Sequence, residues 1–234
     1  AVVVNCNPFT LGHQYLIETA AAQCGVVYLF VVEEDRSVFP FADRWKLVEE
    51  GTAHLPNVVL LKGGTYVVSG AIFPSYFLQN EAPDLVIRNQ AELDVIIFER
   101  HIDPTLGIER RYVGTEPYSG TTAAYNAAMK KILPARGVQV IEIERRAEGK
   151  DADGRPDYIS ATKVRRAIRE GRLDSILGFL PECTRTYLQS AASEGLRALV
   201  VRPHNVYGPR MGFDHVIPQM SIRALRRENP FRVF

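Results

Sequence analysis

Five short segments rich in Val, Leu and Ile predict the strands of a sheet: residues 1–4, 26–32, 58–61, 111–114 and 138–143. The first two contain no charged residue and are too short for buried helices. Such segments are typical of strands that are buried on both faces, as in a parallel sheet.

Between these strands the apolar residues recur at helical spacing. After the first strand, Leu16, Ile17, Ala20 and Ala21 share one face of a helix that starts near Gly12. Further helices are predicted at residues 41–54, 92–101, 121–133, 160–170 and 182–189. Because strands and helices of this length alternate, we expect right-handed crossovers and an α/β, Rossmann-like fold with a parallel sheet.

The pattern is weaker in several other segments. Residues 66–78 are rich in aromatic side chains and irregular, and residues 82–90 fit either an inserted strand or part of a loop. Residues 145–158 are charged and contain Gly and Pro, which is typical of a surface loop. Near the end of the chain, residues 196–201 predict a strand and residues 218–227 a helix.

The turn after the first strand is the first candidate site. It places Thr10, Gly12 and His13 at or near the N-terminus of the following helix. A helix N-terminus carries unpaired N–H groups and the positive end of the helix dipole, so it favours phosphate. Gly12 lets the backbone come close to a ligand, and His13 can donate to a phosphoryl oxygen. The alternative is that His13 only caps the helix.

A second helix N-terminus offers complementary groups. Ser160 is predicted to cap the helix at residues 160–170, and Thr162, Lys163 and Arg165 follow it. Lys163 and Arg165 lie two residues apart on different faces, so we expect only one of them to point at a phosphate. The alternative is a solvated basic face. Together the two N-termini would position a triphosphate and neutralise charge that develops at its α-phosphate, as adenylyl transfer requires.

Composition narrows the choice of partners. The chain of 234 residues has 28 Lys and Arg against 27 Asp and Glu, a net charge of +1, so it shows no bulk affinity for nucleic acid. Its 3 cysteines form no disulfide framework or zinc site, which favours the reducing cytoplasm. No apolar run has transmembrane length, so we expect no membrane partner. The chain starts without Met inside a strand, so we expect a piece of a longer protein.

Two motifs carry a family resemblance. Residues 10–13, Thr-Leu-Gly-His, resemble the (H/T)xGH signature of the nucleotidylyltransferase superfamily, and residues 159–165 resemble its ISTSxxR motif, with Ala161 at the usual Thr position. The order and separation of the two motifs also match. The resemblance implies the Rossmann-like parallel sheet of that superfamily. It favours Arg165 over Lys163 as the phosphate ligand, and it places Gly114, Thr115 and Glu116 near the adenine and ribose.

Longer segments narrow the resemblance. Together they resemble the C-terminal domain of the citrate lyase ligase family, over about residues 1–190: residues 5–18, 28–32, 73–77, 113–117 and 158–160. That family uses ATP and acetate to acetylate the prosthetic-group thiol of the citrate lyase acyl-carrier subunit. By analogy the reaction passes through acetyl-adenylate and releases AMP and pyrophosphate. The implied cofactors are ATP and Mg²⁺, the latter held mainly by phosphate oxygens and water.

The resemblance implies a role for each candidate residue. The α-phosphate would be bound by Thr10 and His13. The outer phosphates would be bound by Ser160, Thr162 and Arg165, with Lys163 beside them. Further contacts to ATP are expected from Asn7, Pro8, Phe9, Gly12, Gly114, Thr115 and Glu116. Acetate is expected near Asn5, Asn7 and Phe9.

Two departures from the family leave alternatives open. An acetyltransferase-like domain usually precedes this one and is missing from the sequence. Residues 195–234 resemble part of an extended short-chain dehydrogenase/reductase, so we expect a domain at 1–190 and a partial epimerase-like segment at 191–234. The alternatives are a metabolite nucleotidylyltransferase, which would use the same two motifs, and a non-catalytic, epimerase-related NAD-binding fragment.

Overall fold

The computed structural model describes residues 1–33, 37–64, 67–68, 83–117, 119–150, 154 and 156–193. The chain divides into two units, Ala1–Ser193 and Glu194–Phe234, and the second lies outside the described residues. The expectations for residues 196–201 and 218–227, and most of those for 66–78, also fall outside them.

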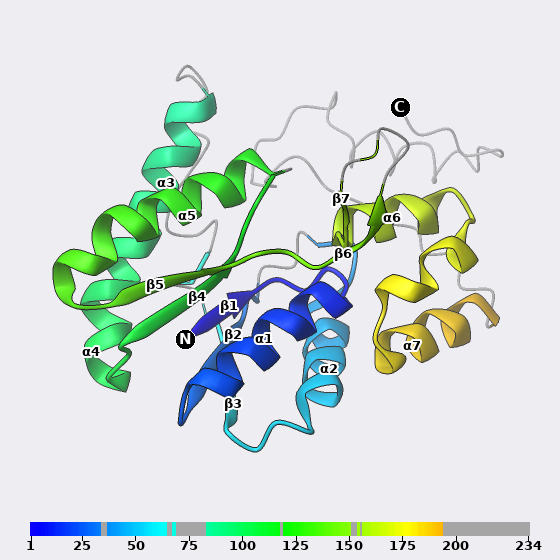
Figure 1. The fold of residues 1–234 in the computed structure, drawn as a ribbon, viewed down its shortest axis with the longest axis horizontal. Helices are drawn as coiled ribbons and strands as arrows, with labels where there is room; N and C mark the ends of the chain where they lie inside the picture. The colour runs from blue at the N-terminus through cyan, green and yellow to red at the C-terminus, as the bar shows by residue number, and fades with distance from the viewer. Residues whose placement is uncertain are drawn as a thin grey trace, which may run out of the picture. The chain divides into compact units, whose positions relative to one another are not determined.

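A five-stranded parallel sheet forms the centre of the first unit (Figure 1). Its strands are β1 (Val2–Val4), β2 (Val27–Val31), β3 (Val58–Lys62), β4 (Arg110–Gly114) and β5 (Gln139–Ile143). Their order is β3-β2-β1-β4-β5. The strand order therefore reverses direction at β1, and in such sheets ligands bind outside the carboxyl ends of the strands at this point. The predicted α/β fold with a parallel sheet is confirmed.

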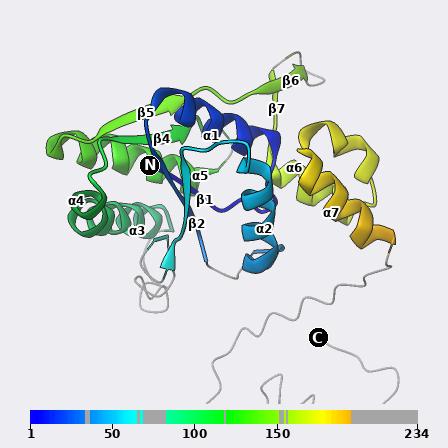
Figure 2. The same cartoon turned by 90° about the horizontal axis from the view of Figure 1, so that it is seen from below.

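Helices cover both faces of the sheet (Figures 1 and 2). The α-helices are α1 (Leu11–Gln23), α2 (Phe41–Thr52), α3 (Pro83–Ile97), α4 (Asp103–Leu106), α5 (Gly120–Ile132), α6 (Ala161–Arg169) and α7 (Glu182–Ser193). A π-helix spans Phe98–Ile102, and 3₁₀-helices span Leu133–Arg136 and Leu173–Phe179. No helix in the described part of the chain is long and apolar enough to cross a membrane.

The core explains the layers. On one face, Val4 and Leu29 of the sheet pack with Ile17 of α1 and Leu47 of α2. On the other face, residues of the sheet pack against α3 and α5. A third cluster joins α6, α7 and the 3₁₀-helix between them. The loops at the carboxyl ends of β1, β4 and β5 therefore rest on a packed scaffold.

Two expectations were wrong. Residues 83–90 are neither strand nor loop but the first half of α3. The helical period continues beyond this segment, because Ala91 and Val95 are buried in the same core cluster, and Pro83 is acceptable at the start of a helix. Within 145–158, β6 (Ala147–Lys150) and β7 (Pro156–Tyr158) form an antiparallel pair rather than a loop. Backbone hydrogen bonds hold this pair, and they leave no apolar signal in the sequence.

Candidate active site

The loop that joins β1 to α1 forms the floor of the candidate site. It spans residues 5–10 at the carboxyl end of β1, where the strand order reverses. Thr10 is the N-cap of α1 and is 2% exposed. A β-carbon built on Gly12 would lie 3.6 Å from Ile159 Cγ2, so the first turn of α1 faces the residues that precede α6. The protein leaves room for a side chain at this position, and only a ligand would require glycine there.

His13 caps its own helix through one ring nitrogen. The backbone N–H of Thr10 lies 3.1 Å from His13 Nδ1, and the Thr10 hydroxyl lies 2.9 Å from the same atom. A backbone N–H can only donate, so Nδ1 is the acceptor and Nε2 carries the proton in the neutral ring. Capping and donation to a ligand thus use different nitrogens, and the two interpretations of His13 are compatible.

The charge state of His13 follows from its surroundings. Burial, together with the nearby positive charges of Arg145 and Arg165, lowers the pKa of His13 to about 4. The ring of Phe9, which is fully buried, stacks on the imidazole with 6.2 Å between centroids. His13 is therefore a neutral Nε2–H donor at neutral pH, held between two cations.

The second motif meets the first through Arg165. Ser160 caps α6 as predicted, and its Oγ accepts from the Thr162 N–H at 3.2 Å. The Arg165 guanidinium donates to the carbonyl oxygen of Asn7 and, at 3.0 Å, to the Thr162 hydroxyl. The structure thus brings Thr10, His13 and the first turn of α6 together. Arg165 joins the two helix N-termini.

Lys163 has different partners. Its ammonium group pairs with Asp157 and donates to the Tyr158 carbonyl oxygen at 3.1 Å, both in β7. Lys163 and Arg165 therefore point in different directions, and it is Arg165 that contacts the loop after β1.

Residues 114–116 are tied to the end of β5. The Thr115 hydroxyl accepts from the Arg145 N–H at 3.1 Å, and the Thr115 carbonyl oxygen accepts from Arg145 Nε. Glu116 forms an ion pair with Arg145 and accepts from the Ser119 N–H at 3.0 Å. The Glu116 side chain is 5% exposed. Its carboxylate is therefore used within the protein, whereas the Gly114 end of β4 borders the site.

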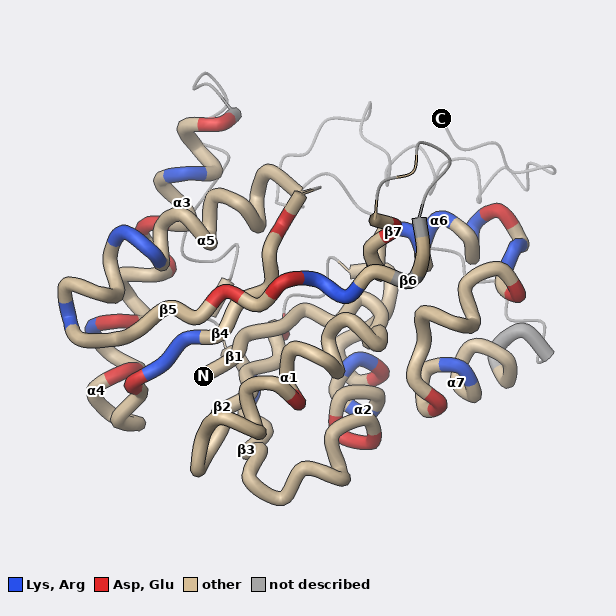
Figure 3. The backbone as a smooth tube through the Cα atoms, in the orientation of Figure 1, with Lys and Arg blue, Asp and Glu red and all other residues tan. Residues whose placement is uncertain are grey.

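Arg145 is a site residue that the sequence reasoning missed. Its charge contributes to the low pKa of His13, so it acts on the proposed phosphate donor. Arg145 follows β5 (Gln139–Ile143) directly, at the carboxyl edge of the sheet. That position is a signal that the sequence offers. Lys and Arg residues gather on the segment that leaves β5 and on α6 (Figure 3).

The loop at residues 5–10 has further supports that the sequence reasoning missed. Arg44 of α2 is fully buried and donates to the Asn5 carbonyl and side-chain oxygens, both at 2.9 Å. The Phe39 N–H donates to Asn7 Oδ1 at 3.1 Å. The side-chain oxygens of Asn5 and Asn7 are thus engaged by α2 and the segment before it.

The remaining residues of this loop are also held in place. The Asn7–Pro8 peptide is cis. The hydroxyl of Thr184, a fully buried residue of α7, donates to the Phe9 carbonyl oxygen at 2.9 Å. Contacts from α2, α6 and α7 thus fix the loop from different sides. Chemically, the site combines two helix N-termini, a neutral imidazole and two guanidinium groups, a set suited to a phosphate chain.

Comparisons with known proteins agree with this chemistry. The chain is 39% identical over 194 residues to citrate (pro-3S)-lyase ligase of Escherichia coli, which covers 81% of this chain and 53% of that protein. It is 38% identical over 196 residues to the ligase of Klebsiella pneumoniae, covering 82% and 55%. The chain spans about half the length of the curated relatives it matches.

A solved structure is also similar. The crystal structure of Thermotoga maritima TmcAL bound with alpha-thio ATP has a TM-score of 0.49 and 16% identity, over 83% of this chain and 55% of that one. That degree of similarity supports no functional argument. The family model of the citrate lyase ligase C-terminal domain matches residues 1–188. This chain therefore belongs to the citrate lyase ligase C-terminal domain family.

Proposed function

We propose that this chain is the ATP-binding part of a ligase that acetylates the prosthetic-group thiol of the citrate lyase acyl-carrier subunit. Membership of the citrate lyase ligase family is the observation that carries the proposal. The neutral His13 between Arg145 and Arg165 supports it, because AMP-forming ligases must stabilise charge on an α-phosphate.

The proposed reaction has two steps. A carboxylate oxygen of acetate attacks the α-phosphorus of ATP, the bond to the β-phosphate oxygen breaks, and pyrophosphate leaves. The thiol sulfur then attacks the acetyl carbonyl carbon, loses its proton, and displaces AMP. His13 Nε2–H donates to the α-phosphoryl oxygen in the first step. Thr10 and the N–H groups of the first turn of α1 lie beside it.

The outer phosphates of ATP would bind at the start of α6. There Ser160 and Thr162 offer hydroxyls and Arg165 offers a planar cation, which matches phosphate oxygens. Pyrophosphate would leave from this side. Gly114 and Thr115, at the end of β4, are proposed to border the nucleoside, with Arg145 behind them.

Magnesium fits this site as an ion carried by the nucleotide. Mg²⁺ prefers oxygen ligands and keeps several waters. The described residues offer hydroxyl oxygens there, and the carboxylate of Glu116 is already paired with Arg145. The proposed Mg²⁺ is therefore held by phosphate oxygens, and when bound it neutralises the charge of the triphosphate. The proposed location of the reaction is the cytoplasm.

ATP–pyrophosphate exchange tests the proposal. Purified chain is assayed with Mg²⁺, with and without acetate, and we expect exchange that requires acetate. His13→Ala should lower its rate by about a hundredfold or more, since a transition-state donor is lost. His54→Ala is the matched control, because His54 pairs with Glu18 on the exposed side of the protein and should exchange like the wild type.

Other outcomes would change the assignment. Exchange that is independent of acetate but requires a phosphorylated metabolite would make the chain a metabolite nucleotidylyltransferase. Full exchange in His13→Ala would contradict the phosphate site. If the chain alone is silent, the assay is repeated with the full-length protein. Silence there as well would reject acetyl-adenylate formation.

A further inference from the structure

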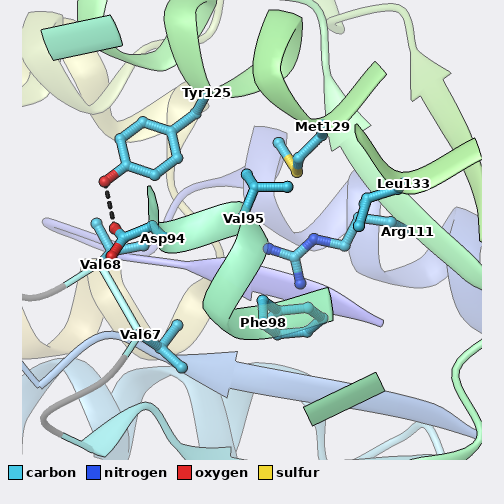
Figure 4. Close-up of a pocket in the computed structure, with 9 residues that line it drawn as sticks. All are labelled: Val67, Val68, Asp94, Val95, Phe98, Arg111, Tyr125, Met129 and Leu133. Carbon is cyan, nitrogen blue, oxygen red and sulfur yellow. Dashed lines mark hydrogen bonds between the residues drawn. The ribbon is translucent and has the colours of Figure 1, made fainter. Parts of the chain in front are cut away.

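A small cavity lies on the face of the sheet that α3 and α5 cover (Figure 4). Its volume is about 30 Å³. Val95, Phe98, Met129 and Leu133 contribute apolar walls, and Asp94, Arg111 and Tyr125 contribute polar groups. None of these residues belongs to the proposed ATP site, and neither of the two motifs accounts for the cavity.

Arg111 is the unusual member of this lining. It is a residue of β4, is only 8% exposed, and its Nη1 has no hydrogen-bond partner in the described structure. The guanidinium carbon lies 4.5 Å from the centroid of the Phe98 ring. Burial lowers the pKa of Arg111 to about 10, so the group remains charged at neutral pH. A buried cation with an unused donor costs free energy unless a partner compensates it.

The nearby acids do not supply that partner. Asp94 is engaged by the Tyr125 hydroxyl, which donates to its Oδ2 on another side of the cavity (Figure 4). The charge of Asp103 reaches Arg111 through space, but both Asp103 carboxyl oxygens are buried without a hydrogen bond among the described residues. The Nη1 donor of Arg111 therefore remains available to a ligand in the cavity.

We propose that this cavity binds one small monovalent anion, a halide or a formate-sized carboxylate, on the Nη1 of Arg111. Size limits the choice, since a water needs about 10–15 Å³ and the cavity admits two or three atoms of that size. Sulfate and phosphate are too large. The apolar walls and the aromatic ring under the guanidinium suit an anion that gives up its water readily, and a bound anion would stabilise the folded chain.

Chlorine-35 NMR tests the proposal with chloride as the probe. Chloride that exchanges rapidly with a protein site broadens the chloride resonance. We expect excess line width with the wild-type chain, its suppression by formate, and no suppression by sulfate at equal ionic strength. Arg111→Met should abolish this excess. Arg110→Met is the matched control, because the neighbouring Arg110 side chain is exposed and donates to the Gln23 carbonyl oxygen.

The outcomes separate clearly. Wild-type line width that Arg111→Met retains in full, or the absence of any excess in the wild type, would overturn the site. Loss in Arg111→Met without competition by formate supports a site for halide alone. If Arg111→Met does not fold by circular dichroism, Val95→Leu replaces it, since one added methylene fills the cavity and leaves the cation. Retained excess line width in Val95→Leu would then reject the proposal.

Discussion

Arg44 and Asn5 are joined by two hydrogen bonds from one nitrogen: Nη1 of Arg44 lies 2.9 Å from both the carbonyl and the side-chain oxygen of Asn5. The same guanidinium donates to the Val32 carbonyl oxygen at 2.7 Å and to the Phe39 carbonyl oxygen at 3.0 Å. A single buried side chain therefore satisfies backbone groups just beyond β1 and β2, and it fixes the start of the loop that carries the candidate site.

Replacing Arg44 should destabilise the fold. Arg44→Met leaves several buried oxygens without a donor, and each loss costs about 1–3 kcal/mol. We expect the free energy of unfolding to fall by roughly 3–5 kcal/mol in urea titrations. Arg166→Met is the control, because the Arg166 side chain is 74% exposed and should change stability by less than about 1 kcal/mol. Equal effects of the two substitutions would contradict this role of Arg44.

The low pKa of His13 predicts a pH dependence of stability. The folded pKa of about 4 lies below the ordinary value of 6.5, so the unfolded chain binds the proton more readily. The wild type should therefore lose stability as pH falls from about 6.5 to about 4, by on the order of 2 kcal/mol from this residue. Urea midpoints measured across this range for the wild type and His13→Asn isolate the contribution. Parallel curves for the two proteins would refute it.

The ion pair of Arg145 and Glu116 should be strongly coupled. Arg145→Met leaves the buried Glu116 carboxylate unpaired, which costs roughly 3–5 kcal/mol. Adding Glu116→Gln removes that charge and should recover a large part of the loss, so a double-mutant cycle measures the coupling. Arg145→Met should also raise the pKa of His13, as read from its imidazole NMR signals, because a nearby positive charge is removed. Additive effects on stability together with an unchanged His13 would show that Arg145 acts on neither group.

Gly51 sets the position of Phe9. A β-carbon at Gly51 would overlap the Phe9 ring, which stacks on His13. Gly51→Ala should therefore shift the ring, cost about 1–3 kcal/mol, and lower the rate of ATP–pyrophosphate exchange. A β-carbon at Gly120 meets nothing within 4 Å, so Gly120→Ala is the control. Wild-type exchange in Gly51→Ala would exclude a positioning role of Phe9.

Much of this protein can be predicted from its sequence because the signals are local. Four residues at the N-terminus predict a buried strand, and β1 spans Val2–Val4. Thr10 and Ser160 stand where caps are expected, and both are N-caps of the helices that follow. Hydrophobic period and capping depend on neighbours within a few residues, so they can be recognised without the fold.

The tertiary structure alone decided which distant groups surround the candidate site. Arg165 contacts Asn7 across 158 residues of sequence, and Thr184 contacts Phe9 across 175. In the sequence, Arg44 is one of many charged residues on a helix, and only the crossing of β1 and α2 makes it a buried donor. Such contacts follow from the strand order, which hydrophobic patterns do not encode.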